Sequence, residues 1–182
     1  PGHHAERDRA MGFCLFGNVA VAAEYMIVEH DVERIAIVDF DVHHGNGTQH
    51  LFEERSDVLF ISLHQHPRTL YPGTGFEHER GRGKGEGYTL NIPLMPGGND
   101  KVYDKAFKEK VIPALDEYKP QALIVSAGVD AETADGFEMM SRHLHDAADR
   151  LCDGRLLTCL EGGYDLDALA DGVERLTRTL VN

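Results

Sequence analysis

The sequence has no tryptophan, only three cysteines and far fewer basic residues than acidic ones. Lysine and arginine number 18 against 31 aspartates and glutamates, which gives a formal net charge of −13. The basic surface that grips a phosphate backbone is therefore missing, and we expect no direct nucleic-acid partner. An acidic surface instead attracts cationic substrates. No run of about 18 apolar residues is present to cross a bilayer, so we expect no membrane partner either.

The three cysteines, Cys14, Cys152 and Cys159, are an odd number and lie in apolar surroundings. Such cysteines are typical of reduced core residues rather than of a disulfide framework or a zinc knuckle. The chain opens on charged residues instead of the apolar segment of a signal peptide. These features favour a reducing, intracellular compartment, and we expect a cytoplasmic protein.

The apolar pattern predicts one α/β domain. A chain of 182 residues, 42% of them hydrophobic, suits a single domain, and no repeat or linker divides it. Strands that alternate with helices indicate a parallel sheet with helices on both faces, whose ligands bind beyond the carboxyl ends of the strands. The predicted strands are 34–40, 58–63, 88–92, 121–126 and 155–160, and the predicted helices are 12–29, 49–54, 102–118, 137–151 and 166 onward.

The first predicted strand runs into Asp39-Phe40-Asp41-Val42-His43. In an extended chain alternate residues face the same way, so Asp39, Asp41 and His43 project together. Two carboxylates and an imidazole that converge inside a sheet repel or desolvate one another unless a cation joins them. The pattern therefore indicates a metal site, with a solvated polar turn as the alternative.

Two further segments after predicted strands carry candidate functional groups. The acidic loop with Asp130, Glu132 and Asp135 could supply another carboxylate ligand, or could simply cap the helix that follows it. The glycines of the turn at 161–164 let the backbone bend and present the hydroxyl of Tyr164. The alternative is an ordinary Gly-rich turn with a packing tyrosine.

The chain also begins with adjacent histidines, His3 and His4. Neutral imidazoles near a metal are suited to general acid–base chemistry near pH 7. A remnant of an affinity tag is the alternative, but the following residues are typical of natural protein. The aromatic residues Phe13 and Tyr71 are core or loop residues unless they line a pocket.

Taken together, these motifs resemble the zinc-dependent histone deacetylase family, in the broad sense that includes acetylpolyamine amidohydrolases and acetoin-utilisation proteins. The resemblance implies an arginase–deacetylase-like three-layer fold. It also implies a metal-dependent amidohydrolase that removes acetyl groups from acetyl-lysine or acetylpolyamines. The matching segments run nearly end to end and are PGHHA, GFCLFGNVA, VDFDVHHGNGTQ, SLHQ, YPGTG, LNIPL, VSAGVDA and EGGY.

Matched residue by residue, the resemblance implies a metal centre with one zinc ion. The zinc ligands of the family fall on Asp41, His43 and Asp135, the last placed by counting five residues past Asp130. Two carboxylates and one imidazole leave the open coordination position that catalytic zinc needs. The family pattern also implies a K⁺ or Na⁺ ion surrounded by Asp39, Asp41, His43, Ser62 and Leu63.

The remaining roles concern proton transfer and substrate. His3 and His4 match the pair that accepts and returns the proton, with His4 as the base. Asp39 and Asn46 match the residues that orient them. Tyr164 matches the donor to the developing oxyanion. The family has a channel for the aliphatic stem of a lysine or polyamine. The substrate-binding residues of its walls match Gly12, Phe13 and Tyr71.

The sequence departs from the family pattern in three places. It begins at the tandem histidines, whereas family domains carry a segment before them. The stretch between Asp135 and Glu161 is short, and Glu132 stands where many bacterial relatives have histidine. We therefore expect residues 1–182 to be a single, partial deacetylase-like catalytic domain, with an exposed sheet edge that favours a homo-oligomer.

Two other functions remain open. A non-catalytic deacetylase-like fragment would bind acetylated amines or a partner without hydrolysing them, and truncation favours this. An arginase-like hydrolase would hold two manganese ions and would need carboxylates such as Asp130 and Asp135 to bridge them. The tandem histidines and the EGGY motif argue against the arginase-like enzyme.

Overall fold

Five parallel strands form the sheet of the computed structural model, which describes residues 1–128 and 133–181. Their order is β3-β2-β1-β4-β5, so β1 pairs with both β2 and β4 at the centre. The outer strands β3 and β5 pair with β2 and β4 respectively, also in parallel. The strand bounds are β1 Ile35–Asp39, β2 Val58–Gln65, β3 Thr89–Leu94, β4 Ala122–Ala127 and β5 Leu156–Leu160.

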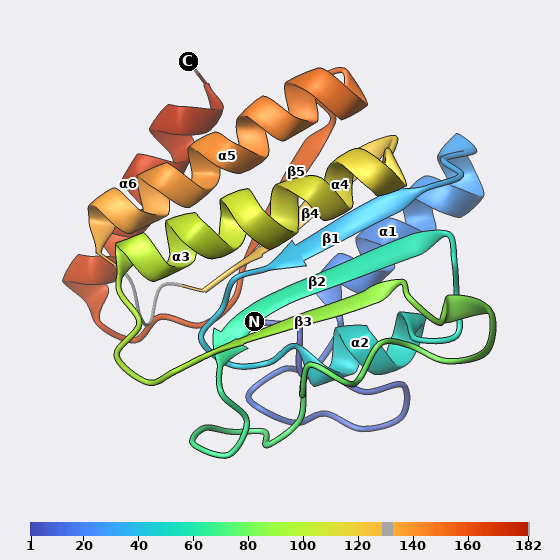
Figure 1. Cartoon of the computed structure of the whole chain (residues 1–182), viewed down its shortest axis with the longest axis horizontal. Coiled ribbons are helices and arrows are strands. Elements are labelled where there is room, and N and C mark those ends of the chain that lie inside the picture. The colour runs from blue at the N-terminus through green and yellow to red at the C-terminus, as the bar shows by residue number, and fades with distance from the viewer. Residues whose placement is uncertain (129–132, 182) are drawn as a thin grey trace.

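Helices cover both faces of this sheet (Figure 1). Ala36 and Val38 of β1 pack in a core with α3, α4 and α5, whereas Ile35 and Ile37 pack in a second core with α1 and α2. Since alternate residues of a strand face opposite sides, both faces of β1 are buried. The prediction of a parallel sheet covered on both faces is confirmed. The helix bounds are α1 Asn18–His30, α2 Asn46–Phe52, α3 Asp100–Ala106, α4 Ile112–Tyr118, α5 Ala134–Cys152 and α6 Leu166–Leu180.

The predicted helix over 12–29 begins six residues later than expected, at Asn18. Gly12 and Phe13 have φ angles of 56° and 62°, which a right-handed helix cannot contain. Phe13 and Phe16, which fall within that predicted helix, are exposed. Periodicity failed here because an aromatic repeat at helical spacing continued into a loop that does not pack on the sheet.

The predicted helix over 102–118 is present but divided. A π-helical turn at Phe107–Val111 separates α3 from α4. Pro113 lies at the start of α4. In a continuous α-helix its ring would clash with the carbonyl four residues earlier, and that carbonyl would lack its N–H donor. The extra residue in the π-helical turn absorbs that conflict.

The register of the strands determines which polar residues meet. Asp39 at the end of β1 is in register with Ser62 of β2 and with Ser126 of β4. The loop after β1 carries Asp41, and the loop after β5 begins at Glu161. All of these positions lie at the carboxyl edge of the sheet, where the sequence predicted the functional site.

The described cysteines are free thiols, with Cys14 and Cys152 buried and Cys159 half-buried. Across residues 1–128 and 133–181, no helix is both long and apolar enough to cross a membrane.

Candidate active site

A cavity of about 590 Å³ opens at the carboxyl edge of the sheet. The chain start, the loop after β1, the long loop after β2 and the turn after β5 all contribute to its walls. Segments far apart in the sequence therefore meet around one space. The predicted residues that it brings together include His3, His4, Asp41, His43, Tyr71 and Tyr164.

The two histidines are buried, and each is held through Nδ1 by a different acceptor. His3 Nδ1 lies 2.8 Å from Asp39 Oδ2, and His4 Nδ1 lies 2.7 Å from Asn46 Oδ1. Asn46 Nδ2 donates to Glu6 Oε1 at 2.6 Å, so its Oδ1 must be the atom that faces His4. His4 Nδ1 therefore carries the proton, and the basic lone pair of neutral His4 lies on Nε2.

The two rings carry opposite protonation at neutral pH. Burial alone would lower the pKa of His3, but the carboxylate of Asp39, helped by Asp41 and Glu161, raises it to about 9. Burial lowers the pKa of His4 to about 4, and the positive charge of His3 acts in the same direction. His4 is thus a neutral base beside a charged imidazolium.

Asp41 and His43 form a pair of potential metal donors on the floor of the cavity. Asp41 Oδ1 lies 3.0 Å from His43 Nδ1 and accepts from the backbone N–H of His43 at 2.8 Å. Burial alone would raise the pKa of Asp41, but the hydrogen bonds from His43 and the charge of His3 lower it to about 2. A carboxylate oxygen and an imidazole nitrogen that point toward one position fit two ligands of a zinc ion.

The backbone of two glycines, Gly128 and Gly162, packs directly against the carboxylate of Asp41. Gly162 N–H donates to Asp41 Oδ2 at 3.1 Å. A Cβ atom added to Gly128 would lie 2.0 Å from that same oxygen. Only glycine can occupy position 128 while Asp41 keeps this orientation, which explains the glycine at the end of β4.

The placement predicted for Asp135 is corrected by the structure. Asp135 lies in the first turn of α5, its side chain is 84% exposed, and Oδ1 lies 3.5 Å from Arg175 Nη1 of α6. Counting residues past Asp130 failed because the helix begins at Ala134 and carries the carboxylate away from the cavity. The loop residues Asp130 and Glu132 lie outside the described residues. The cap of α5 is Thr133, whose Oγ1 accepts from the N–H of Gly136.

The predicted channel residues line the mouth of the cavity. Phe13 and Tyr164, 86% and 67% exposed, face each other edge to face with ring centroids 6.2 Å apart. The ring of Tyr71 stands 5.0 Å from that of His4 and 6.4 Å from that of His43. Gly12 packs against the His4 ring so closely that a Cβ would lie 2.3 Å from it. The arrangement is an aromatic entrance that leads to the histidines.

The residues predicted to surround a monovalent cation lie together beneath this floor. Asp39 Oδ1 accepts from the N–H of Asp41 at 3.1 Å, and Asp39, Ser62 and Leu63 are fully buried. The hydroxyl of Ser62 is 2.9 Å from His64 Nδ1.

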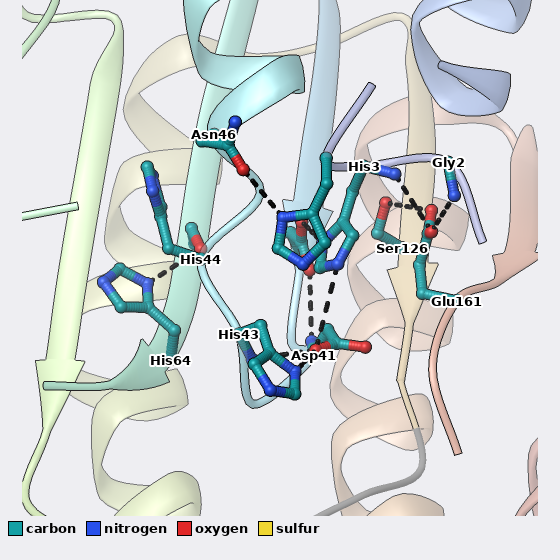
Figure 2. A network of polar contacts seen from close by, with 12 residues as sticks. Gly2, His3, Asp41, His43, His44, Asn46, His64, Ser126 and Glu161 are labelled. Atoms are coloured by element: carbon teal, nitrogen blue, oxygen red, sulfur yellow. Dashed lines mark hydrogen bonds and ion pairs between the residues drawn. The ribbon is translucent and has the colours of Figure 1, made fainter. Parts of the chain in front are cut away.

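Sequence reasoning missed the role of Glu161, which was seen only as the start of a turn. Its buried carboxylate accepts from the backbone N–H groups of Gly2 and His3, and its other oxygen accepts from Ser126 Oγ at 3.1 Å (Figure 2). Glu161 thus fastens the chain start, with both histidines, to the ends of β4 and β5. No local signal could reveal a bond between residues 159 positions apart.

We expect Glu161→Gln to loosen the chain start. An amide keeps one acceptor oxygen but places an NH₂ group against buried donors. This should lower the free energy of unfolding by about 2–3 kcal/mol. Denaturant unfolding measures the effect. Glu174→Gln, on the exposed face of α6, is the matched control, and equal stability of both variants would contradict this role.

Comparison with known proteins places these features in a family context. A sequence profile of the histone deacetylase domain matches residues 1–180. The histone deacetylase-like amidohydrolase of Pseudomonas aeruginosa is 45% identical over 174 residues, which cover 90% of this chain and 46% of that protein. A probable deacetylase of Archaeoglobus fulgidus is 46% identical over 177 residues, 92% of this chain and 48% of that protein.

A solved structure agrees with the fold. The crystal structure of the HDA15 HD domain superposes with a TM-score of 0.91 at 42% identity, over 99% of this chain and 53% of that one. This likeness confirms the arginase–deacetylase-like fold that the sequence predicted. The chain spans about half the length of the curated relatives it matches.

Proposed function

The chain belongs to the histone deacetylase family, and from this premise we propose that it carries the proton-transfer part of a zinc-dependent amidohydrolase. The reaction is removal of an acetyl group from an acetylated amine, with release of acetate. The observation that supports it is the meeting of two differently protonated histidines with Asp41 and His43 in one cavity.

In this reaction the chain's own residues bind and orient the substrate, and they move a proton. His4 Nε2 accepts the proton of the attacking water, while Asn46 holds the ring through Nδ1. His3, kept charged by Asp39, provides positive potential beside the reacting carbonyl. Tyr164 donates its hydroxyl to the developing oxyanion. His4 then returns the proton to the amine that leaves.

Asp41 and His43 are the residues that would hold the zinc ion, with Asp39, Ser62 and Leu63 contributing to a K⁺ or Na⁺ site next to them. A zinc ion held there would supply Lewis acidity and a bound water of lowered pKa. The donor types fit zinc, but they are two of the three protein ligands that a catalytic zinc site has.

The substrate that we propose is an acetylated alkylamine, either acetyl-lysine in a peptide or an acetylpolyamine. The aromatic rings of Phe13 and Tyr71 line the entrance and suit an aliphatic stem. The net charge of −13 attracts cationic substrates of both classes. A second candidate function is binding of acetylated amines without hydrolysis, for which the exposed position of Asp135 beside Arg175 speaks.

The test is acetate release from an acetyl-lysine peptide and, separately, from N-acetylputrescine, with excess Zn²⁺ and then with a chelator. We expect release with zinc and loss of at least about 100-fold in rate with the chelator. The substrate that reacts faster identifies the class. Saturable binding of either compound without acetate release would instead establish the binding function.

A further inference from the structure

The long loop after β2 is fastened to the rest of the molecule at Gly75. Its backbone N–H donates to both carboxylate oxygens of Glu79 at 3.1 Å, and its carbonyl accepts from His64 Nε2 at 2.8 Å. The rings of His44 and His64 pack on its α-carbon, so an added Cβ would lie 2.6 Å from each of them. Figure 2 shows these two rings next to each other, with centroids 4.8 Å apart. The backbone is therefore held on three sides, four residues after Tyr71.

Gln49 of α2 is the buried side chain to which this part of the loop is joined. Gln49 Nε2 donates to Glu79 Oε2 at 2.8 Å, and Glu79 Oε1 accepts from the N–H of Phe76 at 3.0 Å. A carboxylate only accepts, so the oxygen of the amide is the atom that lies 2.9 Å from His44 Nε2 and 2.7 Å from Asn91 Nδ2. Both polar atoms of the Gln49 side chain thus have partners, and these partners fix its orientation.

The same helix also orients the base. Asn46 Oδ1 lies 2.7 Å from His4 Nδ1, and Gln49 follows Asn46 by three residues in α2. The loop returns to the same place, since the ring of Tyr71 stands 5.0 Å from that of His4. One short helix therefore sets the position of the base and, through Glu79, the position of the aromatic wall beside it.

We propose that Gln49 and Glu79 are positioning residues that hold the ring of Tyr71 at the wall of the cavity. The inference deepens the proposed function and rests on it for the identity of the substrate, an acetylated alkylamine. A wall contacts the aliphatic stem equally in the ground state and in the transition state. Loss of its position should therefore raise KM and leave kcat nearly unchanged.

The kinetic test uses the full chain with excess Zn²⁺ and an acetyl-lysine peptide. Gln49→Glu places two carboxylates against each other, and Glu79→Gln places an NH₂ group against another donor in either orientation of the new amide. Each should raise KM by about 5–15-fold, the equivalent of one or two buried methylene groups, with kcat within about threefold. Glu77→Gln, an exposed carboxylate on the same loop, is the matched control and should leave KM unchanged.

The double variant Gln49→Glu with Glu79→Gln exchanges donor and acceptor. The new carboxylate at position 49 can accept from His44, from Asn91 and from the new amide, whose oxygen still faces the N–H groups of the loop. We therefore expect KM to return to within about threefold of the normal value, a coupling that two independent residues would not show.

A second readout does not depend on catalysis. The chain has no tryptophan, so Tyr71→Trp introduces a single indole whose fluorescence reports on the loop. Combined with Gln49→Glu or with Glu79→Gln, this probe should show lower anisotropy and stronger quenching by acrylamide, and the exchanged pair should reverse both changes. Far-ultraviolet circular dichroism confirms that each variant is folded. Because no acetylated amine is present, failure of the positioning inference is separate from failure of the deacetylation test.

Three results would overturn the proposal. One is quenching in both single variants equal to that of the chain with the normal pair. Another is a fall in kcat of about tenfold or more at unchanged KM, which would mean that the pair acts on His4. The third is a double variant no better than its single variants, since residues that work as a pair show coupling.

Discussion

His4→Ala is expected to lower the rate of acetate release by about 10²–10⁴-fold, which is the usual contribution of a general acid–base residue. The expectation depends on the tautomer of His4, fixed by the chain Glu6–Asn46–His4. It depends also on the lowered pKa of about 4, which keeps His4 neutral at pH 7. His3 cannot replace it, because its raised pKa of about 9 keeps it protonated.

The measurement is the initial rate of acetate release at saturating Zn²⁺, together with zinc affinity. His4 is bonded to Asn46 and not to Asp41 or His43, so zinc binding should stay within about threefold while the rate collapses. His30→Ala, at the exposed end of α1, controls for removal of an imidazole. His4→Gln is a second variant in case the cavity left by alanine disturbs folding. A rate within tenfold of normal in both variants would assign the base elsewhere.

The fold was predictable from sequence wherever strands are buried on both sides. Residues 35–38 of β1 form a continuous apolar run, and a strand of that kind has few alternatives once helices flank it. The first helix was mispredicted because periodicity does not register the positive φ angles of Gly12 and Phe13. Such backbone angles depend on tertiary contacts, here the packing of Gly12 against His4.

The candidate site was predictable where its residues are close in sequence. Asp39, Asp41 and His43 are separated by single residues, so local geometry already brings them together. Asp135 could not be placed in this way, because the position at which a helix begins depends on its cap. Glu161 escaped notice because its carboxylate acts on backbone N–H groups at the other end of the chain, and backbone groups leave no pattern in a sequence.

The second large effect is expected for Tyr164→Phe, which should lower kcat by about 10²–10³-fold, the cost of removing one oxyanion donor. The side chain is mostly exposed at the cavity mouth and stands edge to face with Phe13. Phenylalanine keeps that ring contact, so the free energy of unfolding should change by less than about 0.5 kcal/mol. Because the hydroxyl acts on charge that develops in the transition state, KM should change little.

Steady-state kinetics on an acetyl-lysine peptide separate these quantities, with Tyr25→Phe on the exposed side of α1 as the matched control. The turn at 161–164 has the freedom this role needs, since Gly163 has a φ angle of 136° that only glycine adopts easily. The backbone N–H of Gly162 meanwhile stays bonded to Asp41. One end of the turn is thus fixed at Asp41 while the other presents the hydroxyl. If kcat were unchanged and KM raised instead, Tyr164 would be a wall of the channel, and the oxyanion would depend on His3 and the metal alone.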